Sequence, residues 1–410
     1  MTNKDLDFSR LMEEERHHIP RAIANCATEE VDIRDSTRPL HTKGGPPGYV
    51  EKSLAAAAEP FKGITTDGTV IPGLFSIQKT GVSTGSIKKT AEDFLSSLNP
   101  EQRSKTLFPI DTVEWRRWSN IHPTLMRHGM PLFEMTDTQR DRAFAMLRES
   151  LSAEGFQTAR DVMRLNETVM EMTGRLTEYG EDLYWVSIMG QPSATEPWGW
   201  QIDGHHLNIN YFILSDQVVM TPTFLGSEPV HARTGKYAGT RVFKSDEDQG
   251  LAVIRALSEE QRSKAIIAPE PSGEVFTSAF RDNLELKFAG IRYDELSSPQ
   301  HDLLLRLLEL HVGRMRPDHA RVRMEEVKQH LRDTHFCWMG GMNNDSVFYY
   351  RIQSPVIIVE FDHQRGIAFR QYEKPYKDHI HVVVRTPNGN DYGKDLLRQH
   401  YEHSHHGNPN

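Results

Sequence analysis

The sequence predicts a mixed α+β fold, in which a helical N-terminal half packs on a mainly antiparallel C-terminal β-sheet. Between about residues 87 and 175, apolar residues recur at helical spacing. From about residue 180 to 395, short aromatic and β-branched runs separated by turns are typical of strands. Strands and helices do not alternate in series, so a parallel α/β sheet is not expected.

Each element has its own signal. The run 90–98 has helical spacing, and Asn99-Pro-Glu-Gln then combines a capping residue with Pro at the first helical position. Further helices are expected at residues 136–151, 155–174, 258–264 and 298–331. Strands are expected at residues 183–190, 206–214, 217–224, 346–353, 356–362 and 379–385. The second and third of these strands should form a hairpin and the last three an antiparallel meander.

The two ends of the chain differ from the rest. Residues 1–54 contain irregular, Gly- and Pro-punctuated stretches and are expected to form an extended arm. Such an arm wraps the core or a partner subunit, so a homo-oligomer held by the arm is expected. Residues 401–410 form a polar, His-rich tail.

Composition excludes several classes of protein. A formal net charge of -9 argues against a nucleic-acid partner, which needs a dense Lys/Arg face. Two cysteines, Cys26 and Cys337, are too few for a disulfide framework or a Cys-rich zinc site. The N-terminus is polar, and no apolar run approaches the length of a membrane span. We therefore expect a cytoplasmic chain without a membrane partner.

The chemistry is expected at two pairs of histidines. His379 and His381 lie two residues apart on a predicted strand, so their imidazoles face the same side, as a metal ion requires of two ligands. His205 and His206 follow Gly204 where a turn enters a strand. Adjacent strand residues face opposite sides, but the turn could bring both to the site. We expect the four histidines to surround one divalent metal ion; the alternative is a pair of catalytic histidines that act as general acid and base without a metal.

Charged residues near these histidines are the candidates for catalysis. Glu228, Glu360 and Asp362 are expected to act as metal ligands, as orienters of a histidine or as the general base. Arg351 and Arg385 are expected to hold an anionic substrate group, since a guanidinium pairs well with carboxylate or phosphate. A turn residue, an exposed strand face and a salt bridge at the sheet edge are the plain structural alternatives.

Two further pairs are candidates for binding substrate. Asn208 and Asn210 share the strand face of His206, where inward amides would contact a substrate or pin a loop. Trp198 and Trp200 would wall the pocket or pack in the core.

Several of these segments together resemble the DUF3500 family, a domain family of unknown function. The segments are Trp198–Trp200, Gly204–Asn210, Thr221–Pro229, Tyr349–Pro355, Ile358–Asp362 and His379–Arg385. The resemblance covers about residues 55–400 and implies one contiguous unit, but it supplies no reaction. Gln353-Ser354 and residues 386–390 depart from the family pattern, so details of ligand or substrate are expected to differ here.

The leading hypothesis is a metal-dependent hydrolase that acts on a small organic substrate with an anionic or carbonyl group. An ion held by neutral histidines lowers the pKa of bound water towards ~7. Zinc is the expected ion, with iron or copper as alternatives. A non-haem iron or copper oxidoreductase, such as an oxygenase, would use similar ligands. A binding protein with a structural metal is the non-enzymatic alternative.

Overall fold

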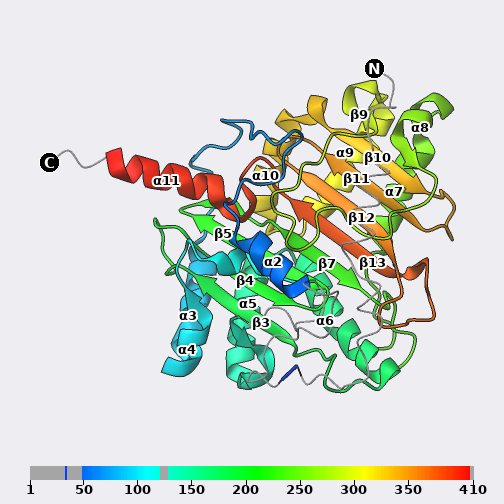
Figure 1. The fold of residues 1–410 in the computed structure, drawn as a ribbon. Helices are drawn as coiled ribbons and strands as arrows, with labels where there is room; N and C mark the ends of the chain where they lie inside the picture. Colours follow the sequence, from blue (N-terminus) through cyan, green and yellow to red (C-terminus); the bar gives the residue numbers. More distant parts are fainter. Residues whose placement is uncertain (1–32, 35–48, 121–127, 407–410) are drawn as a thin grey trace.

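The computed structural model describes residues 33–34, 49–120 and 128–406 (Figure 1). Most of the arm expected at residues 1–54 therefore lies outside the described residues. Of that segment, Ile33 packs beside Leu183 and Trp185, and residues 49–54 already belong to the first labelled helix, α2. The expected tail is described as far as residue 406, as the end of helix α11.

Two helices begin where their capping residues predict. Asn99 and Thr136 each accept a hydrogen bond from a backbone N–H of the first turn, at 2.9 and 3.3 Å. The segment expected as one helix at 298–331 is two helices, because Pro317 lacks an N–H and restricts the residue before it. The helices are α2 Tyr49–Ala58, α3 Gly85–Ser97, α4 Pro100–Thr106, α5 Asp137–Ser150, α6 Ala153–Thr173, α7 Lys244–Ala256, α8 Glu259–Ala265, α9 Ser298–Val312, α10 Pro317–Gln329 and α11 Lys394–His406.

The strands form one 13-stranded sheet in the order β1-β3-β4-β5-β7-β13-β12-β11-β10-β8, with β2, β6 and β9 paired at its margins. Neighbours are antiparallel except for the pairs β1–β3 and β10–β8. The strands are β1 Leu107–Phe108, β2 Met130–Pro131, β3 Tyr184–Met189, β4 Trp198–Gly204, β5 Leu207–Leu214, β6 Gln217–Val219, β7 Thr223–Ser227, β8 Ile266–Ala268, β9 Ile291–Arg292, β10 His335–Gly340, β11 Phe348–Gln353, β12 Ile358–Arg365 and β13 Pro375–Arg385.

The α+β class is confirmed, but a helical N-terminal half is not. Helices α7 to α10 lie in the chain between strands β7 and β10, and β3 to β7 precede them. The expected hairpin of β5 and β6 and the expected meander of β11, β12 and β13 are both present. Strand β13 pairs with β7, which joins the meander to the strands of the first half.

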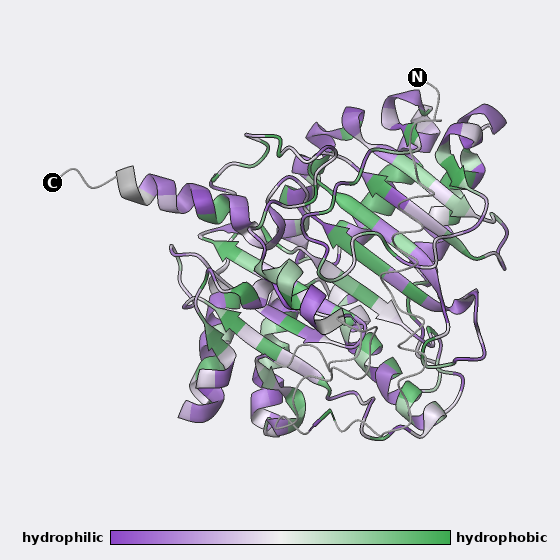
Figure 2. Ribbon diagram, viewed as in Figure 1, coloured by the Kyte–Doolittle hydropathy of each residue, from purple (hydrophilic) through white to green (hydrophobic). Residues whose placement is uncertain are grey.

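The two faces of the sheet differ in chemistry. Along β13, Ile380, Val382 and Val384 point into the main hydrophobic core, which also takes in residues of α3, α5, α6, α7, α9 and α10. Figure 1 shows these helices gathered behind the sheet and α2 in front of it. The alternation is visible in Figure 2 as green and purple bands along the strands.

The opposite face carries His379 and His381 and other buried polar and charged residues, beside two smaller hydrophobic clusters. Residues 276–278 lie against this face, where they form hydrogen bonds with Glu360 and Arg385. Buried polar groups need partners, so the polar side chains of this face bind the segment that covers it. Among the described helices, none has both the length and the hydrophobicity that crossing a membrane requires.

Candidate metal centre

The β4–β5 hairpin brings the first pair of histidines to the polar face. Gly204 pairs with Leu207, so His205 and His206 are the two residues of a tight turn. His206 adopts a left-handed backbone conformation, with φ of 63°, a region that is uncommon for residues other than glycine but in which Asn, Asp and His are enriched. The imidazole rings of His205 and His206 stack with centroids 3.9 Å apart. Because His205 and His206 lie in the turn and not on a regular strand, their side chains do not point to opposite faces of the sheet.

Strand β13 supplies the second pair, and the two pairs meet. His379 Nε2 lies 3.1 Å from His381 Nε2 and 3.2 Å from His206 Nε2. All three side chains are buried, and each can direct one nitrogen to a common point. Two nitrogens at these separations subtend roughly 100° at an ion about 2.05 Å from each, which lies between octahedral and tetrahedral angles. The spacing of His206, His379 and His381, whose ligand nitrogens all lie within 4.8 Å of one another, is therefore compatible with one metal ion.

A glycine makes room for this convergence. Gly226 on β7 lies opposite His381 in the sheet, and its N–H donates to the His206 carbonyl oxygen at 2.7 Å. A Cβ at this position would lie 2.7 Å from His381 Cδ2 and 3.2 Å from His206 Cδ2. Both distances are shorter than ordinary carbon contacts. The absent side chain of Gly226 is thus what allows the two rings to approach each other.

The orientation of His379 is fixed from outside the cluster. Its Nδ1 donates a hydrogen bond to the Arg365 carbonyl oxygen at 2.7 Å, and a Glu228 carboxylate oxygen lies 3.6 Å from the same nitrogen. This arrangement leaves the Nε2 lone pair directed into the cluster. Burial lowers the pKa of His379. Burial, together with the neighbouring His379 and His205, lowers the pKa of His381 well below its usual value. Both shifts favour the neutral ring, which is the form that a metal ligand requires.

His381 has a carboxylate at its outer edge as well. Its Nδ1 lies 3.9 Å from Glu274 Oε1, and neither atom has a hydrogen-bond partner within the described part of the chain. Burial raises the pKa of Glu274 to about 8. Burial, together with the neighbouring Glu274 and Glu360, raises the pKa of Asp362 well above its usual range. Glu274 was not expected from the sequence. It lies in a connection without periodic pattern, and only the chain fold brings it beside β13.

The fourth expected ligand, His205, lies beside the cluster. Its Nδ1 donates to Asn166 Oδ1 at 2.8 Å, on helix α6, and its ring contacts Tyr179 with centroids 5.3 Å apart. The His205 ring stacks on His206 and holds that ring in place. His205 thus supports the cluster of His206, His379 and His381 without being one of its three members.

Glu228 and Glu360 are anchors for covering segments. Glu228 accepts hydrogen bonds from the backbone N–H groups of residues 367–369 and from the Tyr376 hydroxyl. Glu360 accepts from the N–H groups of Phe276 and Thr277, from the Thr277 hydroxyl and from the Tyr349 hydroxyl. Their oxygens are occupied, which contradicts a role for either as general base. Asp362 differs, because its Oδ1 has no partner among the described residues.

The model of the family described as "Protein of unknown function (DUF3500)" matches residues 80–394, more than half of the sequence. The chain belongs to the DUF3500 family. No curated protein and no solved structure matches it. The region of this DUF3500 chain that the family model matches contains His206, His379, His381 and Glu274.

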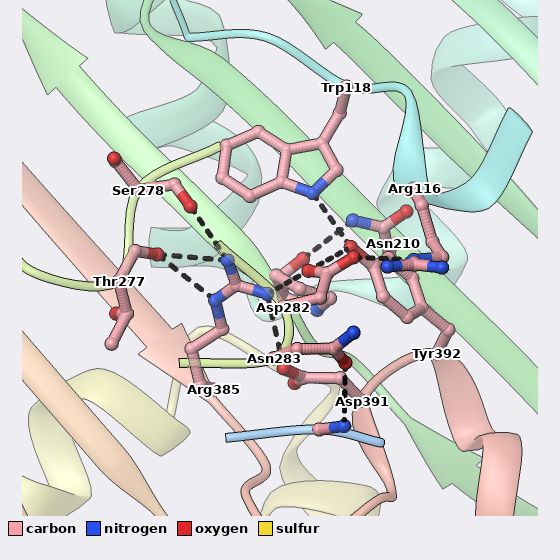
Figure 3. A network of polar contacts seen from close by, with 12 residues as sticks. Arg116, Trp118, Asn210, Thr277, Ser278, Asp282, Asn283, Arg385, Asp391 and Tyr392 are labelled. Carbon is pink, nitrogen blue, oxygen red and sulfur yellow. Dashed lines mark hydrogen bonds and ion pairs between the residues drawn. The ribbon is translucent and has the colours of Figure 1, made fainter. Parts of the chain in front are cut away.

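Arg385 and Arg351, the two arginines of this DUF3500 chain that were expected to hold a substrate, differ in how far their nitrogens are occupied. Arg385 donates to the carbonyl oxygens of Thr277 and Ser278 and pairs with Asp282 at 2.8 Å and Asp391 at 3.2 Å (Figure 3). All of its nitrogens are occupied inside the protein, so the expectation that it clamps a substrate is not met. Arg351 is also buried, with Nη2 bonded to the Lys287 carbonyl oxygen at 3.1 Å and its guanidinium 5.7 Å from the Phe276 ring. Its Nη1 has no hydrogen-bond partner among the described residues, so contact of Arg351 with a substrate stays a prediction.

The expected substrate-binding residues divide in the same way. Trp198 and Trp200 lie on the apolar face, opposite to the histidines, where Trp200 stacks on Tyr211 with centroids 5.1 Å apart. They do not line the site, because odd and even residues of β4 face opposite ways. Asn208 and Asn210 do share the face of His206, but Asn210 Nδ2 donates to Asn208 Oδ1 at 2.8 Å. Their amides pin neighbouring loops, and their contact with a substrate remains a prediction.

Proposed function

We propose that the chain is a metal-dependent enzyme, a hydrolase in which one divalent ion is held by His206, His379 and His381. The observation that carries the proposal is the convergence of the three Nε2 atoms, 3.1 and 3.2 Å from one another around His379. Three neutral ligands leave the full charge of the ion available to a fourth, non-protein ligand. An ion in this setting lowers the pKa of bound water and polarises a substrate carbonyl.

The surroundings of the ligands support the proposal. Glu228 and Glu274 lie at the Nδ1 edges of His379 and His381, at 3.6 and 3.9 Å. An acceptor behind a ligating histidine fixes its ring and raises its basicity, and for His379 this acceptor is the Arg365 carbonyl oxygen at 2.7 Å from Nδ1. Because each carboxylate is at the far edge of its ring, the ligand set consists of histidines alone. Three histidines match catalytic zinc sites better than the two-histidine, one-carboxylate arrangement of non-haem iron oxygenases.

The substrate that this arrangement favours is a small molecule with a carbonyl group, such as an ester or amide. The anionic class expected from the sequence is less favoured on the side of Arg385, since its guanidinium is fully occupied by Asp282, Asp391 and backbone carbonyls. The unpartnered Nη1 of Arg351 is the group that could still hold an anion. Polarisation of a carbonyl by the ion needs no additional cation in the protein. We also propose, from the sequence, that the chain resides in the cytoplasm and forms a homo-oligomer through its N-terminal arm.

The test is metal content together with activity. Chain purified without an affinity tag should contain close to one equivalent of zinc by elemental analysis and should cleave members of a panel of chromogenic esters. The variant His379→Ala/His381→Ala should contain none and be inactive. The matched variant His301→Ala/His335→Ala changes two half-buried histidines outside the cluster and should retain both metal and activity.

Three outcomes would contradict the proposal. Stoichiometric metal in His379→Ala/His381→Ala would place the site elsewhere. Tightly bound iron, with oxygen consumption and no hydrolysis, would favour the oxidoreductase. Bound metal without any ligand exchange, shown by failure of azide or imidazole to perturb the spectrum of the cobalt-substituted chain, would favour a structural ion.

A further inference from the structure

The order of the elements in this chain occurs twice. From Gly85 the chain runs through α3, α4, β1, β2, α5, α6, β3, β4, β5 and β7, and from Lys244 through α7, α8, β8, β9, α9, α10, β10, β11, β12 and β13. Strand β6 is additional in the first series. The two series meet where β7 pairs with β13, and the strands follow in equivalent order on both sides of this pair (Figure 1). Residues 85–227 are called the first unit below, and residues 244–385 the second unit.

The register of the strands is the same in the two units. In the first unit Val186 of β3 pairs with Ile202 of β4, and in the second unit Phe336 of β10 pairs with Ile352 of β11, each 150 positions further along the chain. The same offset relates β5 to β12, which pair with β4 and β11. The parallel pairs β1–β3 and β8–β10 also take equivalent places. The shared register thus defines which residue of one unit corresponds to which residue of the other.

Identical residues recur at equivalent places in the two units. Residues 101–105 and residues 260–264, at α4 and α8, both read Glu-Gln-Arg-Ser-Lys. Exposed helix positions tolerate many residue types, so the fold does not require this identity. Segments 129–147 and 290–308 share five further residues at the same spacing: Gly129 and Gly290, Glu134 and Glu295, Gln139 and Gln300, Asp141 and Asp302, and Leu147 and Leu308.

One polar contact is repeated in detail. The side-chain amides of Gln102 and Gln139 donate to each other at 3.4 and 2.8 Å, and Gln139 also donates to the carbonyl oxygen of the last residue of α3 at 2.9 Å. Gln261 and Gln300 donate to each other at 3.0 and 2.8 Å, and Gln300 also donates to the carbonyl oxygen of the last residue of α7 at 2.8 Å. Each of the four glutamines also completes a capping box. Both units therefore pack their helix ends in the same way.

We propose that the first and second units are two copies of one unit, and that the metal ion of the proposed function binds between them. His206 belongs to the first unit, and His379 and His381 belong to the second. The place of the ion rests on the proposed function, whereas the repetition of the unit does not.

The equivalent turn of the second unit carries no metal ligand. The offset of 150 places Pro355 and Val356, between β11 and β12, where the first unit has His205 and His206. Val356 is fully buried within a hydrophobic cluster. Of the two equivalent turns, one carries histidines, so the repeat predicts one ion per chain and not two.

An ion with ligands from both units adds a link between them. The pairing of β7 with β13 already joins the units without the ion. A ligand that binds only the joined state raises the association constant by a factor of one plus the ratio of its concentration to its Kd. At a free zinc concentration of about 100 times the Kd, this factor is about 100.

Cleavage of the full-length chain between the units tests the repeat. A recognition sequence for a site-specific protease is inserted between the exposed residues Arg233 and Thr234, in the connection from β7 to α7, and the folded chain is cleaved there. After unfolding in urea and dilution, the two fragments should reassemble to the size of the intact chain in gel filtration. A matched cleavage between Ala194 and Thr195, in an exposed loop inside the first unit, divides that unit and should prevent reassembly.

The same cleaved chain tests the place of the ion. Zinc should strengthen the association of the two fragments about 100-fold, at the excess over its Kd given above. In His206→Ala the fragments should still reassemble, but zinc should have no effect on their association. His301→Ala changes a half-buried histidine outside the cluster and is the matched control, in which the zinc effect should persist.

Different results overturn the two parts of the proposal. Fragments cleaved after Arg233 that do not reassemble, with or without zinc, would overturn the repeat. Equal reassembly after cleavage at Ala194 would also overturn it, because the boundary between units would then have no special place. Zinc that binds the uncleaved chain but does not strengthen association, or that strengthens it equally in His206→Ala, would overturn the place of the ion between the units. An uncleaved chain without any bound zinc would refute the proposed function instead, and the reassembly after cleavage at Arg233 would still decide the repeat.

Discussion

Replacing Gly226 with Ala should disrupt the metal centre while leaving the ligands themselves unchanged. The added Cβ would lie 2.7 Å from His381 Cδ2. Carbon atoms in contact are normally about 3.5 Å apart or more, so the His381 ring must retreat by about 0.8 Å. Metal–ligand distances tolerate deviations of about 0.2 Å, so one of the three nitrogens leaves the coordination sphere. We expect metal affinity to fall at least about tenfold, equivalent to about 1.4 kcal/mol.

The assay is competition with a chromophoric chelator, combined with urea unfolding of the metal-free chain. Gly226→Ala should weaken the metal and lower the free energy of unfolding by about 1–3 kcal/mol, since the Cβ also lies 3.0 Å from the Ile380 carbonyl oxygen. Gly85→Ala, an exposed helical position in α3, is the control and should leave the affinity unchanged. A Gly226→Ala chain that binds zinc as tightly as the wild type would refute the convergence of His206 and His381 on one ion.

Three further predictions concern other buried groups. Glu228→Gln keeps an oxygen that can accept from the N–H groups of residues 367–369, but it removes the negative charge 3.6 Å from His379 Nδ1. Metal affinity in the chelator assay should therefore fall about tenfold. Unchanged affinity would show that this carboxylate only anchors its loop. Arg385→Met leaves buried carboxylates without their cation and should lower the free energy of unfolding in urea by about 3–5 kcal/mol; a loss below about 1 kcal/mol would contradict the buried ion pairs. Burial lowers the pKa of His311 to about 3, so between pH 6.5 and 3 the unfolded chain binds a proton that the folded chain does not. Stability should fall as the pH falls through that window, with this residue contributing up to about 1.4 kcal/mol per pH unit, and His311→Phe should show a smaller slope than the wild type in urea titrations at each pH; equal slopes would contradict it.

The fold could be predicted where local signals decide it. Helix starts at Asn99 and Thr136 follow from capping residues, and the C-terminal meander follows from alternating strands. Strands β4 and β10 were not expected, and neither was helix α7. The pairing of β13 with β7 joins residues more than 150 positions apart, and no local pattern specifies which strand lies beside which. The order of the sheet therefore depends on tertiary packing that periodicity does not encode.

The candidate site divides along the same line. His379 and His381 could be placed on one face because the period of a strand is two. The contribution of His206, rather than His205, depends on the positive φ of a turn residue, which the sequence does not specify. Glu274 was missed because it lies in an irregular connection, where spacing carries no information about direction. A sequence therefore reveals ligands that share an element more readily than groups assembled from different segments.

Glu360 and Arg385 show how the predicted and the missed residues are connected. Glu360 accepts hydrogen bonds from the N–H groups of Phe276 and Thr277, and Arg385 donates hydrogen bonds to the carbonyl oxygens of Thr277 and Ser278. Both side chains therefore hold the same segment against the sheet, two to four residues after Glu274. Because Glu274 reaches within 3.9 Å of His381 Nδ1, that attachment determines what lies behind a candidate ligand. Glu360 and Arg385, which the sequence predicted to be catalytic, thus act on the site through the segment that they hold. Their charged groups bind this segment and position it, and they do not contact a substrate.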